Sequence, residues 1–288
     1  DGFSLMLPDC IQLIDNPAGK TFVVIDHPQV SARIALEGAH LLQCTPKGQL
    51  PLLWVSPDDP QLPGKSLRGG IPLCWPWFGG DRPAAAHGIA RRAKWVLSTA
   101  TEDSQGVYLR FDLPAACISE QLPGEPWQVY VEFRLGAGLD VQLTTTNMGA
   151  EPMKLSQALH TYLPVGSIHQ ARISGLDASC YIDALDGWTH KTQAGDVQFK
   201  AELDRIYYGH GDNLYLHAGD NSVVVERQGS ESVVVWNPWV DKSLRLSEFP
   251  AEGYLRMLCI EAANAGPDAR VLQPGEQHTL GTRIQHAD

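Results

Sequence analysis

The sequence has 288 residues, with 22 Lys and Arg against 33 Asp and Glu, which gives a net charge of −11 at pH 7. This acidic balance argues against a nucleic-acid partner, because binding a phosphate backbone requires a dense set of basic residues. Hydrophobic residues make up 43% and charged residues 19% of the chain, a composition typical of globular proteins and not of disordered ones.

Short segments with β-branched or alternating apolar residues recur along the whole chain and predict strands. Turn signals rich in Gly, Pro and Asn separate these segments, and no helical period persists for long. We therefore expect an all-β fold, a large antiparallel β-sandwich in which residues 1–288 form a single domain. A β-propeller would show a repeat of about 40 to 50 residues, and no such repeat is visible. In chain order the expected strands are 21–25, 30–36, 107–111, 129–135, 139–145, 223–226, 233–236 and 255–261.

The expected location is the cytoplasm. No apolar run approaches the roughly 20 residues of a membrane-spanning helix, and the N-terminus shows no secretion signal. We therefore expect no membrane partner, and a monomer or a weak oligomer. The cysteines occur singly in apolar or mixed segments, which predicts reduced core residues rather than disulfides. They are Cys10, Cys44, Cys74, Cys117, Cys180 and Cys259.

The longest irregular segments, 56–81 and 114–126, are expected to wrap the sheets or to border a site. In the first, Arg68 precedes Gly69 and Gly70, and a block of Trp, Pro and Phe follows. The glycines would allow a close approach of backbone to ligand, the aromatic faces suit a sugar, and Arg68 offers a planar donor fork to an oxyanion. The alternative is a tight turn followed by an aromatic core.

A second basic segment begins at His87 and contains Arg91, Arg92 and Lys94. Arg91 could converge with Arg68 on one anion, and a small phosphorylated metabolite needs only two or three such cations. The alternative is a solvated run of charges. No phosphate-binding loop, dinucleotide motif or metalloprotease histidine pair is present, so neither a nucleotide nor a metal is expected.

Strand alternation places His160 on one face with Ala158 and Tyr162. A histidine exchanges protons near neutral pH and is therefore a natural acid toward a sugar ring oxygen. The alternative is a hydrogen-bonded structural histidine.

Near the C-terminus, alternation aligns Leu255, Met257, Cys259 and Glu261, so that a carboxylate ends an apolar row. Burying an uncompensated carboxylate is costly, so Glu261 must meet a partner or lie at a pocket. The alternative is a strand-end glutamate that faces water.

Six fragments together resemble the glucose-6-phosphate 1-epimerase (hexose-6-phosphate mutarotase) family, and they occur in that family's order along nearly the whole chain. The resemblance implies the galactose-mutarotase-like β-sandwich and no cofactor. The substrate it implies is a sugar phosphate, whose α and β anomers interconvert through ring opening. The fragments are 68–72, 87–91, 158–162, 204–207, 236–239 and 259–261.

The same resemblance implies a role for each site residue. His160 would be the general acid on the ring oxygen and Glu261 the general base on the anomeric hydroxyl. Arg68 and Arg91 would hold the 6-phosphate, and the remaining contacts to the sugar would come from Asp204 and His87.

The chain departs from the family at two positions. Ala86 stands where some members have a ligand-binding Gln, which removes one polar contact to the substrate, and Leu163 replaces an aromatic residue, which should alter packing more than chemistry. Two alternative functions stay open at this point: a mutarotase for unphosphorylated aldoses, and a non-catalytic carbohydrate-binding sandwich.

Overall fold

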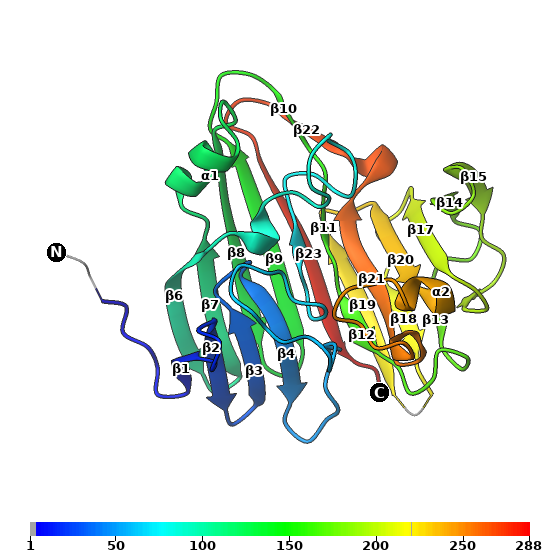
Figure 1. Ribbon diagram of the computed structural model, residues 1–288, viewed down its shortest axis with the longest axis horizontal. Coiled ribbons are helices and arrows are strands. Elements are labelled where there is room, and N and C mark those ends of the chain that lie inside the picture. Colours follow the sequence, from blue (N-terminus) through cyan, green and yellow to red (C-terminus); the bar gives the residue numbers. More distant parts are fainter. Residues whose placement is uncertain (1–3, 220) are drawn as a thin grey trace.

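The computed structural model describes residues 4–219 and 221–288, in which three large antiparallel sheets dominate (Figure 1). The longest sheet has nine strands, which pair in the order β16-β13-β18-β19-β23-β9-β8-β7-β6. Their bounds are β6 Val96–Asp103, β7 Gly106–Asp112, β8 Trp127–Leu135, β9 Leu139–Asn147, β13 Arg172–Ser174, β16 Val197–Gln198, β18 Leu214–His217, β19 Ser222–Gln228 and β23 Gln277–His286.

An eight-stranded sheet and a four-stranded sheet lie in front of the nine-stranded one (Figure 1). The eight-stranded sheet has the order β15-β14-β17-β20-β21-β11-β5, and β12 also pairs with β21. Its strands are β5 Leu73–Cys74, β11 Gln157–Leu159, β12 Tyr162–Pro164, β14 Cys180–Asp183, β15 Thr189–Thr192, β17 Leu203–Tyr208, β20 Ser232–Asn237 and β21 Met257–Asn264. The four-stranded sheet contains β1 Ile11–Asp15, β2 Thr21–His27, β3 Val30–Ala35 and β4 His40–Pro46.

The remaining elements are short. A two-stranded sheet joins β10 Met153–Leu155 to β22 Arg270–Leu272. The helices of the described residues are α1 Ala115–Gln121 and α2 Trp239–Ser243, with 3₁₀ turns η1 Ala90–Arg92, η2 Gly253–Leu255 and η3 Gly266–Asp268. Among these described helices, none is long and apolar enough to cross a membrane.

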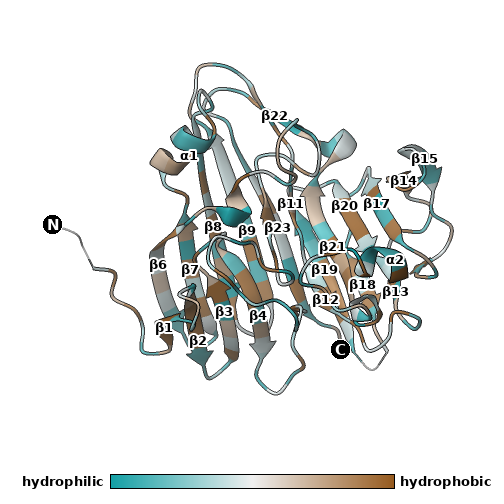
Figure 2. Cartoon of the chain, viewed as in Figure 1, coloured by the Kyte–Doolittle hydropathy of each residue, from teal (hydrophilic) through white to brown (hydrophobic). Residues whose placement is uncertain are grey.

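One hydrophobic cluster fills the space between the sheets. It includes Ile34 of β3, Phe111 of β7 and Ile260 of β21, each at most 1% exposed, so all three large sheets contribute to one core. Burial alternates along β8, where every second residue from Trp127 to Leu135 is buried, and Figure 2 shows similar alternation on many strands. The expected antiparallel β-sandwich is therefore confirmed.

All eight expected segments overlap strands, with one correction that matters for the site. The last segment begins at Met257, because Leu255 belongs to the 3₁₀ turn η2. Strand β21 then continues to Asn264, so Glu261 lies within the strand and not at its end. With 1% of its side chain exposed, Glu261 does not face water.

The two irregular segments also differ from each other. Segment 56–81 contains only the two-residue strand β5 and borders a pocket of about 710 Å³, as expected, whereas 114–126 contains helix α1. That helix is only seven residues long, too short for a sequence period to reveal it.

The six cysteines are all free, but the expectation that they lie in the core is wrong for half of them. Cys44, Cys74 and Cys259 are buried, Cys10 and Cys117 are partly buried, and Cys180 is exposed at the start of β14. The thiolate is the reactive form, and burial raises the pKa of Cys44 to about 12. Reactivity should therefore follow exposure.

We expect a thiol reagent such as iodoacetamide to modify Cys180 first in the native protein. The buried Cys44 and Cys259 should react only after denaturation, because their thiols are shielded and remain protonated. Peptide mass spectrometry over a time course measures the order, and a Cys180→Ser variant should lose the fast phase. Modification of Cys259 at the rate of Cys180 would contradict the burial described here.

Candidate active site

A pocket opens on the eight-stranded sheet, on the face turned away from the sandwich core. On β21, Leu258 and Ile260 point into that core, while Cys259 and Glu261 point to the opposite face. This outer face is covered by segment 64–92 and by residues 242–248. The cavity has a volume of about 710 Å³, and all six residues predicted from the sequence line it: Arg68, His87, Arg91, His160, Asp204 and Glu261.

Strand register brings His160 and Glu261 together. His160 lies between the end of β11 and the start of β12, and both of these strands pair with β21. Leu159 pairs with Ala262, and Tyr162 pairs with Cys259, which leaves His160 opposite Glu261. His160 Nε2 lies 3.6 Å from Glu261 Oε1. The two side chains are therefore neighbours although 101 positions (261 − 160) separate them along the chain.

Burial shifts the pKa values of this pair in opposite directions. It lowers the pKa of His160 well below its ordinary value, with His87 as a smaller cause, and it raises the pKa of Glu261 well above its ordinary value, with Asp204 as a smaller cause. The mutual contact favours the charged forms, but both side chains are largely removed from water, so we take burial as the larger effect. Glu261 Oε1 accepts no hydrogen bond within the described protein.

Aromatic rings fix the orientation of the His160 imidazole. Tyr162 stacks on it with ring centroids 5.0 Å apart and an interplanar angle of 24°. Trp54 lies near Tyr162, with ring centroids 5.9 Å apart and planes inclined by 25°. Trp236 and His87 meet the imidazole edge to face, at 5.9 and 5.6 Å. The packing leaves the imidazole little freedom to rotate.

His87 presents one N–H group at the pocket. Its Nδ1 accepts a hydrogen bond from the backbone N–H of Gly79 at 3.0 Å, so a neutral ring carries its proton on Nε2. Burial, with Arg91 and Arg68 as further causes, lowers the pKa of His87 to about 4. At neutral pH His87 is therefore a fixed neutral donor, suited to a hydroxyl oxygen and unsuited to a proton acceptor.

Two arginines supply positive charge to one wall of the pocket. Arg68 Nη1 lies 3.5 Å from the hydroxyl of Tyr162, and Arg91 Nη2 donates to the carbonyl of Ala86 at 3.2 Å. Arg91 Nε is buried and donates to no group of the described protein. Both guanidiniums therefore keep donors available for an anion.

Asp204 and Lys242 line another part of the wall. Asp204 pairs with Trp236 in the β17–β20 ladder, and burial raises its pKa although Lys242 opposes the shift. Lys242 comes from α2 and forms a 3.8 Å ion pair with Glu202. The site thus combines a contacting histidine and glutamate, positive charges and hydrogen-bonding groups in one cavity.

A model of the aldose 1-epimerase family matches residues 21–285. A curated protein of Escherichia coli strain K12, named "Putative glucose-6-phosphate 1-epimerase", is 34% identical over 264 residues, which is 89% of this chain and 87% of that protein. This chain belongs to the aldose 1-epimerase family.

Solved structures agree with this assignment. A structure titled as a "putative mutarotase" from Salmonella typhimurium matches this aldose 1-epimerase family member with a TM-score of 0.90 at 28% identity, over 99% of this chain and 96% of that one. A galactose mutarotase-like protein from Lactobacillus casei shares the fold, with a TM-score of 0.71 at 16% identity, over 92% and 100% of the two chains. The expected family and its galactose-mutarotase-like fold are confirmed.

Two expectations for the glycine and aromatic segment are wrong. Gly69 and Gly70 do not line the pocket; a Cβ on Gly70 would lie 2.2 Å from the carbonyl oxygen of Leu41, so these glycines allow close contact within the chain and not with a ligand. Trp75 is fully buried in the core. Of the aromatic residues in this segment, only Phe78 lines the pocket.

The basic segment that begins at His87 was expected either to bind an anion or to form a solvated run of charges, and its residues differ in which description they fit. Arg91 is partly buried in the site, as the convergence of the arginines requires. Arg92 is exposed but also lines the pocket, while Lys94 is exposed outside it, as in a solvated run. Of the two departures from the family, Ala86 is exposed and Leu163 is fully buried in the main core. Leu163 therefore contributes to packing, as expected.

Sequence reasoning assigned no role to several pocket residues. Trp236 and Tyr162 occurred in the fragments that carried the resemblance, and alternation with Val234 would have placed Trp236 on the same face. Lys242 lies in a five-residue helix, which carries no readable period. Nothing in the sequence identified Lys65 at the rim of the pocket.

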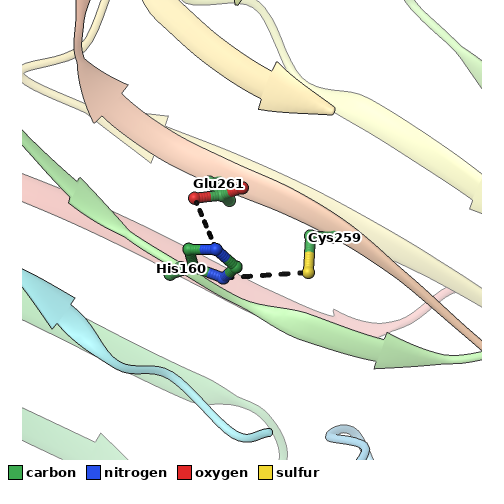
Figure 3. Close-up of side chains that lie close together, drawn as sticks. All are labelled: His160, Cys259 and Glu261. Atoms are coloured by element: carbon green, nitrogen blue, oxygen red, sulfur yellow. Dashed lines mark hydrogen bonds and ion pairs between the residues drawn. The ribbon is translucent and has the colours of Figure 1, made fainter. Parts of the chain in front are cut away.

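A third side chain completes the group around His160. Cys259 Sγ lies 3.8 Å from His160 Nδ1, and it comes from the same strand as Glu261 (Figure 3). The ligand atoms of these three residues lie within 4.8 Å of one another, a spacing that a metal ion could also use. However, the two contacts involve different nitrogens of one ring, and a single ion binds only one of them, so the contacts as they stand are not those of one bound ion.

Proposed function

We propose that this protein interconverts the α and β anomers of a hexose 6-phosphate, with His160 and Glu261 as its acid and base. The observation that carries the proposal is the 3.6 Å contact between His160 Nε2 and Glu261 Oε1 inside a pocket that Arg68 and Arg91 also line. The E. coli relative is named for glucose 6-phosphate, which supports that sugar as the first substrate to test.

The reaction requires one proton acceptor and one proton donor beside the anomeric carbon. Glu261 takes the proton of the anomeric hydroxyl while His160 gives a proton to the ring oxygen, so the bond between C1 and the ring oxygen breaks and the aldehyde forms. Rotation about C1–C2 presents the other face of the carbonyl. His160 then removes the proton from the attacking hydroxyl and Glu261 returns its proton to the new anomeric oxygen.

The pKa shifts of His160 and Glu261 support a reaction in which the two residues share one proton. The pair alternates between protonated His160 with ionised Glu261 and neutral His160 with protonated Glu261. Burial favours the neutral form of each residue, which lowers the pKa of His160 and raises that of Glu261, so the pair suits a cycle that includes neutral His160 with protonated Glu261.

The other side chains fit the parts of the substrate that do not react. Arg68 and Arg91 offer donors to the 6-phosphate, while the Nε2–H group of His87 and the Asp204 carboxylate suit sugar hydroxyls. That residues 1–288 form one domain, a cytoplasmic monomer or weak oligomer without metal or cofactor, stays a prediction.

Anomer exchange measured by NMR tests the proposal directly. Exchange spectroscopy on glucose 6-phosphate and on glucose, with and without protein, should show acceleration of both exchanges and a higher kcat/KM for the phosphorylated sugar. Preference for glucose would favour an unphosphorylated aldose as the substrate. If the protein accelerates neither exchange, the non-catalytic carbohydrate-binding interpretation is favoured instead.

Replacing Arg68 by Ala should lower kcat/KM for glucose 6-phosphate by about 10 to 100 fold and leave that for glucose nearly unchanged. A hydrogen bond to a charged group contributes about 1.5 to 3 kcal/mol, and every 1.4 kcal/mol is tenfold. Arg134→Ala, which removes an exposed arginine from the nine-stranded sheet, is the matched control and should change neither value. Equal losses on both sugars would exclude a phosphate-specific role for Arg68.

A further inference from the structure

A buried lysine lies next to the segment that forms one wall of the pocket. Lys20 immediately precedes β2 of the four-stranded sheet, and its side chain is only 1% exposed. Lysine is almost never buried to this degree unless its charged group is paired. Lys20 does not line the pocket, so any effect on a substrate there acts through the groups that its ammonium binds.

The ammonium group of Lys20 has one acceptor for each of its three N–H donors. Nζ donates to the carbonyl of Lys65 at 2.8 Å, to the carbonyl of Leu62 at 3.3 Å and to Glu37 Oε2 at 3.3 Å. The same Glu37 oxygen accepts the backbone N–H of Gly64 at 2.8 Å. Lys20 and Glu37 therefore bind three backbone groups of residues 62–65.

The backbone that Lys20 binds continues directly into the wall of the pocket. Residues 64–68 line the pocket as one uninterrupted run, which carries the cations Lys65 and Arg68. Residues 62–65 are exposed, so apolar burial does little to fix them, and surface loops without such burial are ordinarily mobile. The contacts of Lys20 and Glu37 thus supply the order that packing does not.

Two further side chains bind the ends of the same loop. Asn16 Nδ2 donates to the carbonyl of Gln61 at 2.9 Å, and Asp59 Oδ2 accepts the backbone N–H of Arg68 at 2.6 Å. Asn16 Oδ1 also accepts the backbone N–H of Lys20 at 2.9 Å. One turn of the four-stranded sheet therefore holds both Lys20 and the start of the loop.

We propose that Lys20 is a positioning residue, which holds the backbone of residues 62–65 so that Arg68 and Lys65 meet the 6-phosphate of the substrate. This inference rests on the function proposed above. His160 and Glu261 come from other strands, so Lys20 should affect the preference for a phosphorylated sugar more than the proton transfers. A misplacement of about 1 Å caused by a distant substitution can cost about 10² fold in rate.

Replacing Lys20 by Met keeps an unbranched side chain and removes all three donors. We expect Lys20→Met to lower kcat/KM for glucose 6-phosphate about tenfold and kcat/KM for glucose by less than about threefold. In hydrogen-exchange mass spectrometry, peptides that cover residues 62–68 should exchange faster than in the wild type, because the loop has lost its anchor. Peptides of β20 and β21 should stay protected.

A destabilising substitution elsewhere in the same sheet is the matched control. Ile25 is fully buried in β2 and belongs to the main core, and Ile25→Ala lowers stability by leaving a cavity without removing a contact of Lys20. It should keep the wild-type ratio of the two kcat/KM values and the wild-type exchange of residues 62–68. A purely structural role for Lys20 would make Lys20→Met behave like Ile25→Ala.

Asn16→Asp tests the same loop with a milder change, and it decides the question if Lys20→Met does not fold. The substitution keeps the oxygen that accepts the N–H of Lys20 and replaces the amide donor to Gln61 by an oxygen that repels the carbonyl. Asn16 is partly exposed, so the fold should persist. We expect the preference for glucose 6-phosphate over glucose to fall about threefold, with faster exchange of residues 62–68.

The positioning role is wrong if folded Lys20→Met keeps the wild-type preference for glucose 6-phosphate, or if it loses activity equally on both sugars. If Lys20→Met does not fold, an unchanged preference in Asn16→Asp overturns it. If the wild-type protein accelerates neither anomer exchange, the proposed function fails, while the hydrogen exchange of residues 62–68 still tests whether Lys20 holds the loop.

Discussion

Replacing Glu261 by Gln should lower the rate of glucose 6-phosphate anomer exchange by about 10² to 10⁴ fold, the usual contribution of one positioned general base. Gln keeps the shape and hydrogen-bonding atoms of the side chain but cannot accept the anomeric proton. Substrate binding should persist within a few fold. Exchange spectroscopy measures the rate, and titration of the variant with glucose 6-phosphate measures the binding.

The Glu261→Gln substitution should preserve the fold. Its effect on stability, measured against the wild type, should become more favourable as pH rises. Burial raises the pKa of Glu261 in the folded state above its ordinary value of 4.5. Between these two values the unfolded chain has lost a proton that the folded protein still holds, so the free energy of unfolding of the wild type falls with increasing pH. Gln has no such proton. The melting temperature of the variant relative to wild type should therefore rise from pH 4 upward.

An exposed glutamate, Glu151, provides the control for the Glu261→Gln substitution. Glu151→Gln makes the same chemical change at an exposed position outside the pocket and should leave the exchange rate unchanged. If Glu261→Gln is folded and retains more than about a tenth of the wild-type exchange rate, Glu261 is not the base.

The sequence predicted strands with clear apolar alternation and missed others, among them the ten-residue β23 and β6, in which only Ala100 is buried. Segments 107–111 and 129–135 alternate because one face of their sheet packs on the core and the other does not. Strands such as β5 and β16 have two residues each, and two residues contain no period. They form because neighbouring strands hold them, which is tertiary information.

The chemistry of the site was predictable from residue types, but its geometry was not. A carboxylate in an apolar strand had to be paired or to lie at a pocket, and Glu261 does both. Its contact with His160 depends on the register of β11 and β12 against β21, which spans about a hundred residues of chain. Residue type also cannot distinguish an aromatic side chain that packs in the core from one that faces a ligand, which explains the wrong expectation for the aromatic block that contains Trp75.

Replacing His160 by Asn should remove most catalysis, about 10² to 10⁴ fold, and leave binding of glucose 6-phosphate within a few fold. The Asn amide can donate a hydrogen bond to the ring oxygen but cannot transfer a proton to it. The variant also loses the ring that stacks on Tyr162, so its melting temperature should be slightly lower. His169→Asn, a change at an exposed histidine outside the pocket, should keep full activity.

The pH dependence of His160→Asn separates proton transfer from simple loss of packing. In the wild type the pair is active only while it holds one proton, so kcat/KM should fall at low pH, where the pair gains a second proton, and at high pH, where it loses the only one. With Asn in place of His160 the residual rate should follow Glu261 alone: it rises with pH as the carboxylate ionises, then stays level. A bell-shaped profile with near-normal exchange in this variant would mean that another group supplies the acid.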